Sequence, residues 1–300
     1  MNRRCQRLGY GLLIIGSCLL GFSSCDPQTP KDDEFAIHFD LSNANERKVY
    51  ISELTVEGEV ILDSIRIEKD GSGSYIGKVE HRSMYMIKTE NNLLNFVTLL
   101  PDSTEIIKVS ANYDSLVETY NLWICRKVKE RLAENKNLDK TSLKAIQKVN
   151  LHSMECSGFT ASDLILPLQK MVRKNLILVD SLSHIWQENL YNPKADSIRL
   201  VLDSIYTQVS RQQRQLQIKL AAENTQNLVP IYAIYQLCGE RMLLDFENPT
   251  DLDSISKWVE RMLQTQRGNP HVDKLKMRVD RLKSMQKQNK LKIETPNSIQ

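Results

Sequence analysis

The pattern of apolar and polar residues changes its period once along the chain. From Phe35 to Leu41, apolar residues alternate with small or polar ones, which predicts a strand with one apolar face. Six further short apolar runs, several of them separated by turn residues, predict strands at 49–51, 60–67, 75–79, 85–88, 95–100 and 105–109. Short strands at this spacing favour an antiparallel β-sandwich or an open barrel over residues 35–112.

After about Tyr113 the period becomes that of a helix. Seven long segments with few glycines predict helices at 114–135, 141–153, 161–190, 195–224, 228–246, 251–266 and 271–290. Thr250 and Asp253 have the spacing of a capping box, and Pro270 suits the first turn of the last helix. We therefore expect an α+β protein in which an all-α helical domain at 113–292 follows the β-domain, with a short tail at 293–300.

The first 24 residues have the order of a secretory signal. Basic residues precede a short apolar stretch, and a pair of serines precedes Cys25. The apolar stretch is shorter than the roughly 20 residues that a membrane-spanning helix needs. Phe22-Ser23-Ser24-Cys25 resembles a lipoprotein signal box, in which the cysteine is acylated and becomes the new N-terminus. We therefore expect residues 1–24 to be removed and Cys25 to be the lipid attachment site. A plain signal peptide followed by an incidental cysteine is the alternative.

Lipid on Cys25 would place the protein in the cell envelope, at the outer membrane on its periplasmic side or at the cell surface. Residues 25–34 are polar and contain prolines, which predicts a flexible tether between lipid and fold. Within it, Lys31, Asp32, Asp33 and Glu34 resemble the lysine-plus-acid export signal of surface lipoproteins in Bacteroides-type bacteria. A solvated run of charges is the alternative reading of these four residues.

The net charge of +3 lies wholly in the expected signal segment, whose three arginines are accompanied by no acidic residue. Residues 25–120 hold 9 basic and 18 acidic residues, whereas residues 121–300 hold 28 basic and 19 acidic ones. The β-part is therefore acidic and the helical part basic, each by nine charges. Hydrophobic residues make up 41% of the chain and charged residues 26%, as in ordinary globular proteins. The export signal, and not the charge, argues against a nucleic-acid partner.

Part of the chain resembles a known family. Residues 39–111 contain Ile61-Leu62-Asp63-Ser64-Ile65, the Asp70-Gly71 turn and a closing run at 105–109. This region resembles a small β-domain of unknown function at the N-terminus of many Bacteroides-type thiol–disulfide interchange lipoproteins. The segments 220–235, with Asn227-Leu228-Val229-Pro230, and 269–282 look like the helical linker of that family. A thioredoxin-like domain with a Trp-Cys-x-x-Cys motif usually follows there, but no Cys-x-x-Cys occurs in this sequence, so the redox activity is not carried over.

The resemblance implies a lipid-anchored, non-catalytic binding or scaffold module, with a thioredoxin-like envelope protein as a candidate partner. One alternative is a participant in periplasmic thiol–disulfide exchange, through Cys125, Cys156 or Cys238. Spacing leaves open whether two of these three form a disulfide or all three are buried thiols. A second alternative is a structural lipoprotein exposed at the cell surface.

The sequence gives no positive sign of an enzyme or a cofactor. It contains no P-loop, no nucleophile elbow and no His-Glu-x-x-His motif. His152 and Cys156 stand four residues apart, as metal ligands on a helix do, but a structural zinc site needs four such ligands. We therefore expect no catalytic residues, no metal and no cofactor.

Asp-Ser followed by an aliphatic residue or threonine occurs more often than chance pairing predicts. This triplet resembles the O-glycosylation acceptor of Bacteroides-type exported proteins. The candidate acceptors are Ser64, Ser103, Ser115, Ser181, Ser197, Ser204 and Ser254. The preference of both residue types for turns and helix caps is the alternative explanation for several of them.

Overall fold

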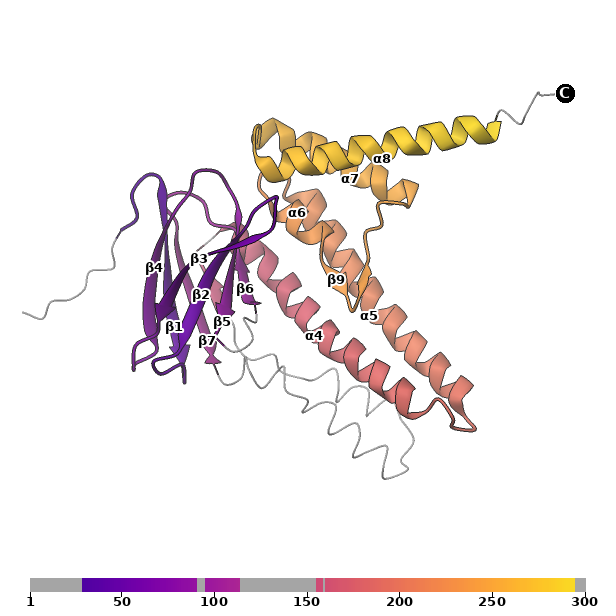
Figure 1. Cartoon of the computed structure of the whole chain (residues 1–300), viewed down its shortest axis with the longest axis horizontal. Coiled ribbons are helices and arrows are strands. Elements are labelled where there is room, and N and C mark those ends of the chain that lie inside the picture. Colours follow the sequence, from indigo (N-terminus) through magenta and orange to yellow (C-terminus); the bar gives the residue numbers. More distant parts are fainter. Residues whose placement is uncertain (1–28, 91–94, 114–154, 159, 295–300) are drawn as a thin grey trace, which may run out of the picture.

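The computed structural model describes residues 29–90, 95–113, 155–158 and 160–294 (Figure 1). Strands fill the part before residue 113 and helices fill most of the part after residue 160, so the fold class is α+β, as the sequence predicts. The predicted helices at 114–135 and 141–153 lie outside the described residues. None of the described helices has both the length and the apolar character that crossing a membrane requires.

The β-part consists of two four-stranded sheets with the strand orders β4-β1-β7-β8 and β3-β2-β5-β6. One apolar cluster takes side chains from both sheets, for example Phe35 and Ile37 from the first and Ile51 and Ile87 from the second. The alternation in the sequence thus buries one face of each sheet against the other, and the sheets do not close into a barrel. The strands are β1 (Glu34–Ser42), β2 (Lys48–Leu54), β3 (Glu59–Arg66), β4 (Ser72–Lys78), β5 (Met84–Thr89), β6 (Asn95–Leu99), β7 (Ile106–Asn112) and β8 (Glu155–Ser157).

Two features of the sheets depart from the sequence prediction. β1 pairs with β4 in the antiparallel sense but with β7 in the parallel sense, with Ile37 opposite Ile107. A parallel pair needs a long connection, and here the chain between the two strands builds β2 to β6. β8 pairs with β7, with Cys156 opposite Val109, so a strand lies in the region predicted to be all-α.

Four helices agree closely with predicted segments: α4 (Ala161–Glu188), α5 (Ala195–Glu223), α7 (Pro249–Thr265) and α8 (Pro270–Glu294). α4 begins at a capping box formed by Thr160 and Asp163, and α8 begins at Pro270 as predicted. The predicted start of α7 is wrong. Its N-cap is Asn248, whose side chain accepts hydrogen bonds from the backbone N–H groups of Thr250 and Asp251.

The predicted helix at 228–246 is also wrong. Only α6 (Val229–Ile234) is helical, and a small hairpin follows, made of β9 (Leu237–Cys238) and β10 (Arg241–Met242). Gly239 turns this hairpin with a φ of +62°, a conformation that glycine adopts at low cost. The fully buried Gln213 and Gln217 of α5 donate to the carbonyls of Leu237 and Ala233. These long-range bonds satisfy groups that a continuing helix would have used itself.

The helices lie beside the second sheet and share a core with it (Figure 1). Met84 and Leu100 of the β-part pack with Ile165 and Leu168 of α4 in one apolar cluster. Gln169 of α4 pairs with the backbone of Thr98 in β6: its Oε1 accepts from the Thr98 N–H at 2.7 Å and its Nε2 donates to the Thr98 carbonyl at 2.6 Å. A side-chain amide thereby occupies backbone groups that another strand would otherwise pair with.

Candidate functional site

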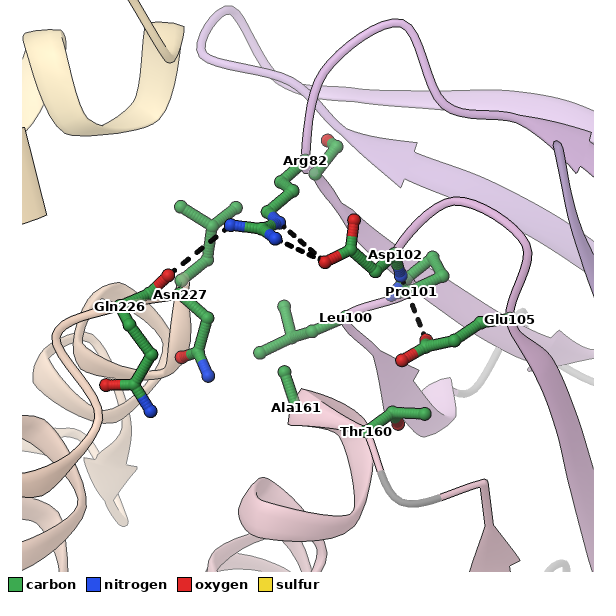
Figure 2. A pocket seen from close by; sticks show the side chains of 11 residues that line it. Arg82, Leu100, Pro101, Asp102, Glu105, Thr160, Ala161, Gln226 and Asn227 are labelled. Atoms are coloured by element: carbon green, nitrogen blue, oxygen red, sulfur yellow. Dashed lines mark hydrogen bonds and ion pairs between the residues drawn. The ribbon is translucent and has the colours of Figure 1, made fainter. Parts of the chain in front are cut away.

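A pocket of about 230 Å³ lies where the sheets meet the helices. Four segments line it: the β4–β5 connection, the β6–β7 connection, the start of α4 and the α5–α6 connection. Figure 2 shows polar side chains from all four segments grouped around the apolar Leu100 and Ala161. Because the walls come from both parts of the molecule, the pocket exists only when the sheets and the helices are docked.

Arg82 of the β4–β5 connection spans the pocket (Figure 2). Its Nε donates to Asp102 Oδ2 at 2.9 Å, a second guanidinium nitrogen contacts the same oxygen, and a third donates to the carbonyl of Gln226 at 3.4 Å. The side chains of Arg82 and Asp102 are 37% and 43% exposed, so their ion pair contributes less than about 1 kcal/mol. Its main effect is to hold three connections in one arrangement.

Glu105 carries the most perturbed carboxyl group of the pocket. Its Oε2 accepts a hydrogen bond from the backbone N–H of Asp102 at 2.9 Å. Burial raises the pKa of Glu105 from 4.5 to about 7, and the negative charges of Asp102 and Asp163 act in the same direction. The hydrogen bond from Asp102 and the positive charge of Arg82 oppose this rise but do not cancel it. Glu105 therefore changes its charge near neutral pH, which is unusual for a carboxyl group.

The start of α4 forms one wall of the pocket. Thr160 Oγ1 accepts from the N–H of Ser162 at 3.1 Å, and Asp163 Oδ2 accepts from the N–H of Thr160 at 3.4 Å. Ser162 Oγ in turn accepts from the N–H of Leu100 at 2.8 Å. The capping box thus fixes the helix start and the connection after β6 together, so this wall is rigidly placed.

A buried serine–histidine pair borders the pocket, and its serine, Ser83, is one of the lining residues. Ser83 Oγ and His271 Nε2 are 3.3 Å apart, and Asn269 Nδ2 donates to the carbonyl of Arg82 at 2.7 Å. Burial lowers the pKa of His271, so the ring is neutral at physiological pH. Among the described residues no carboxylate bonds the other ring nitrogen, so the third member of a Ser–His–Asp arrangement is missing. The pair joins the start of α8 to the β4–β5 connection.

The lining of the pocket offers several groups that can form hydrogen bonds with a small polar molecule. Glu105 offers a carboxyl group, and the side-chain amides of Gln226 and Asn227 offer both donors and acceptors. Arg82 already has its partners and orients the site. In the described part of the chain, no cluster of three or more histidine, cysteine or acidic side chains could hold a metal ion.

A second, wider groove of about 550 Å³ runs between α4, α5 and the β9–β10 hairpin. Trp186 and Tyr206 line it, and the guanidinium of Arg241 lies 5.9 Å from the Tyr206 ring centre. Cys238 at its base is a free, buried thiol, and burial raises its pKa. Reactive cysteines have a lowered pKa, so Cys238 has the opposite character.

The structure places only some of the residues that the sequence singles out. Cys25, Ser115, Cys125 and His152 lie outside the described residues, and Cys156 lies on β8.

Of the candidate export residues, Lys31, Asp32 and Asp33 are exposed, and Glu34 begins β1. The N–H of Lys31 donates to Glu34 Oε2 at 3.1 Å, and the Asp33 carbonyl accepts from the N–H of Val79 at 2.7 Å. The predicted tether therefore ends before residue 34, because its last residues already join the sheet.

The candidate glycosylation serines differ in exposure. Ser64, Ser103, Ser197 and Ser204 are exposed. Ser181 is fully buried and donates to the carbonyl of Ile177, while Ser254 is half-buried and donates to that of Thr250. The Asp-Ser pattern thus includes both accessible side chains and helix-internal ones, and the structure brings none of these serines into the pocket.

The residues of the pocket were missed by reasoning from the sequence. Arg82, Asp102 and Glu105 have no motif spacing, and Arg82 meets Gln226 across 144 positions of the chain. The only local signal was the Pro101-Asp102 turn, which predicts a connection but no site. Comparison with models of protein families and with curated proteins finds no match for this chain. The site therefore rests on its geometry alone.

Proposed function

We propose that the protein is a lipid-anchored protein of the cell envelope that acts as a non-catalytic binding module. The observation that carries the proposal is the pocket between the two parts, with Glu105 close to half-ionised at neutral pH and held beside Arg82 and Asp102. A mostly polar pocket with acceptor groups fits binding better than catalysis, because among the described residues the Ser83–His271 pair has no carboxylate that would complete a catalytic triad.

The ligand class follows from the groups that lack a strong partner. Arg82 is bonded to Asp102 and Gln226, which leaves Glu105 as the principal charged group available to a ligand. A carboxyl group of this kind binds an amine best, because the bound cation favours the ionised form. A volume of about 230 Å³ suits a molecule of a few heavy atoms. We infer that the ligand is a small polar molecule with an amino group.

Thermal unfolding of the purified full chain tests this inference. Glycinamide and ethanolamine serve as amine probes, and ethylene glycol serves as a neutral control of similar size. The amines are expected to raise the melting temperature at pH 8, and Glu105→Gln is expected to remove the effect, because the amide keeps the shape of the side chain without its charge. Glu68→Gln, at an exposed glutamate, is the matched control. No rise with either amine, or an equal rise in Glu105→Gln, contradicts the proposal.

The lipid anchor is tested separately. Labelled palmitate is expected to enter the wild-type chain in its native host, and Cys25→Ser is expected to abolish the label and release the protein from membranes. More than one acyl chain is needed for lasting anchorage, since each buried methylene contributes only about 0.8 kcal/mol. A Cys25→Ser variant that stays labelled would show that another residue is acylated.

The non-catalytic character is tested by insulin reduction with the purified chain and dithiothreitol. We expect no turnover above background, because the described thiol, Cys238, is buried and its pKa is raised. Measurable turnover would favour the thiol–disulfide alternative. We propose further that a thioredoxin-like envelope protein is the partner. This proposal rests on the family resemblance, and it is tested by adding such a protein to the same assay.

A further inference from the structure

The second sheet has two edges, and the described residues cover only one of them. At β6 the side chain of Gln169 bonds the backbone of Thr98. At the other edge, β3 has β2 on one side and no described strand on its far side. The N–H of Ser64 donates to the carboxylate of its own neighbour Asp63 at 2.7 Å instead of to another strand. An uncovered edge of this kind is a template for a further strand.

The same strand exposes apolar side chains on both faces. Val60 is 48% exposed, Ile61 is 51% exposed and Leu62 is 42% exposed, and they follow one another without a break. Single exposed aliphatic residues are normal, but three in succession on a sheet edge form a continuous apolar patch. β3 therefore has both the unpaired backbone groups and the exposed apolar side chains that suit pairing with another strand.

The side chains of β3 point to the two faces of the sheet in an order that is symmetrical about the centre of the strand. In the pairing of β3 with β2, Ile51 lies opposite Asp63 and Ser52 opposite Ile61, so Leu62 is an extra residue in β3. The extra residue restarts the alternation of faces. As a result, the order of faces is the same when it is followed from either end. Of the residues in register with β2, Glu59, Ile61, Ser64 and Arg66 lie on the helix-covered side of the sheet, and Val60, Asp63 and Ile65 lie on the core side.

We propose that β3 pairs in the antiparallel sense with β3 of a second copy of this chain, about a twofold axis between Leu62 and Asp63. Val60 then lies opposite the partner's Ile65, and Ile61 lies opposite the partner's Ser64, each pair on one face. At the ends of the strand, Glu59 lies opposite the partner's Arg66, so acid meets base on both sides of the axis. In this register all eight residues of β3 are paired.

Alternative registers fit less well. A shift by one residue places core-side residues opposite residues of the other face, and a one-residue slip in a sheet misplaces every side chain. A shift by two shortens the ladder and separates Glu59 from the partner's Arg66. Lys88 already holds the Glu59 carboxylate, which orients this end of the strand. The complementarity of the strand with itself is what favours a second copy over an unrelated partner strand.

Disulfide cross-linking of the full chain in intact cells tests the pairing. Ile61→Cys combined with Ser64→Cys places cysteines directly opposite each other in the two copies, where Cα atoms about 4.5–5.5 Å apart suit a disulfide. A band at twice the mass of the chain is expected on a non-reducing gel. Replacing Ser64 also removes a candidate glycan acceptor, so modification there cannot block the edge. The wild-type chain controls for its native cysteines.

A matched double variant tests whether the two cysteines must lie on the same face of the sheet to cross-link. Ile61→Cys with Ile65→Cys has the same number of new cysteines on opposite faces, and it is expected to give at least about fivefold less dimer. Arg66→Glu in the first background places like charges opposite each other and is expected to lower the dimer fraction severalfold, whereas Lys69→Glu beside the strand leaves it unchanged. No dimer band from a protease-resistant Ile61→Cys, Ser64→Cys protein overturns the proposal. Equal cross-linking in both double variants overturns it as well, because it indicates random collision.

Discussion

The pKa of Glu105 predicts how the stability of the protein depends on pH. The carboxyl group has a pKa of about 7 in the folded state against an ordinary value of 4.5, chiefly because of burial. Between these two values the folded state holds more protons than the unfolded state, so the free energy of unfolding falls as the pH rises from about 4.5 to about 7. Above pH 7 Glu105 is ionised in both states, and the loss of free energy of unfolding that it causes has reached its full size. Glu105→Gln removes the charge and therefore removes this part of the pH dependence.

The size of the effect follows from the change in pKa. A rise from 4.5 to about 7 corresponds to about 3 kcal/mol, since each tenfold change in acidity is worth about 1.4 kcal/mol. Glu105 is partly exposed, so solvent screening reduces the usable difference to about 1–2 kcal/mol. The glutamine can still accept the hydrogen bond from the Asp102 N–H, because one of its two terminal atoms is a carbonyl oxygen.

Urea unfolding at a series of pH values between 4.5 and 8.5 measures this difference. Glu105→Gln is expected to be more stable than the wild type by about 1–2 kcal/mol at pH 8, with the gain vanishing near pH 4.5. Using the difference between the two proteins cancels the titration of all other groups. Glu68→Gln, at an exposed glutamate, is expected to show no such trend. A difference that does not change with pH, or a less stable Glu105→Gln at pH 8, would refute the reasoning.

Three further predictions concern other parts of the chain. Gln169→Ala is expected to lower the free energy of unfolding by about 2 kcal/mol, because it removes both hydrogen bonds to the Thr98 backbone. Gln212→Ala, on the exposed side of α5, is expected to change it by less than about 0.5 kcal/mol, and equal urea midpoints would contradict this. Gly239→Ala is expected to cost about 1–2 kcal/mol, measured in the same way, because its Cβ would lie 2.7 Å from the Val179 side chain at a positive φ; an unchanged midpoint would show that the hairpin adapts. Mass spectrometry of the native protein is expected to find glycans on exposed Asp-Ser serines outside β3, such as Ser197 and Ser204, but none on Ser181, whose modification would contradict its burial.

The β-sandwich and four of the helices were predictable because their signals are local. A strand such as β1 shows its apolar alternation within a few residues, and α4 shows its helical period and its cap in the same way. The parallel pairing of β1 with β7 was not predictable, because alternation reports which face is buried but not which strand lies next to it. The helix predicted at 228–246 failed for a related reason. Gln217 donates to the Ala233 carbonyl of α6 and Gln213 donates to the Leu237 carbonyl of β9, and both glutamines lie on another helix, α5.

The candidate site could not be predicted from the sequence for a chemical reason as well. Arg82, Asp102 and Glu105 are common surface residue types, and only their convergence gives them an unusual environment. The pKa of Glu105 is raised by burial and by the negative charges of Asp102 and Asp163, which come from the two different parts of the chain. By contrast, the lipid signal at Cys25 is contiguous in the sequence, and it remains a prediction because that residue lies outside the described structure.

The contacts between the start of α8 and the β4–β5 connection have a consequence for the order of folding. Ser83 and His271 are 188 residues apart, and Asn269 and Arg82 are 187 apart. Contacts of such long range form late, because the chain between them must first lose its freedom. A chain that is still emerging can build its sheets early, but it cannot seat α8 until nearly all of it is present. Met84 and Leu100 then lack part of their final cover, so a partly emerged chain exposes apolar surface at this place.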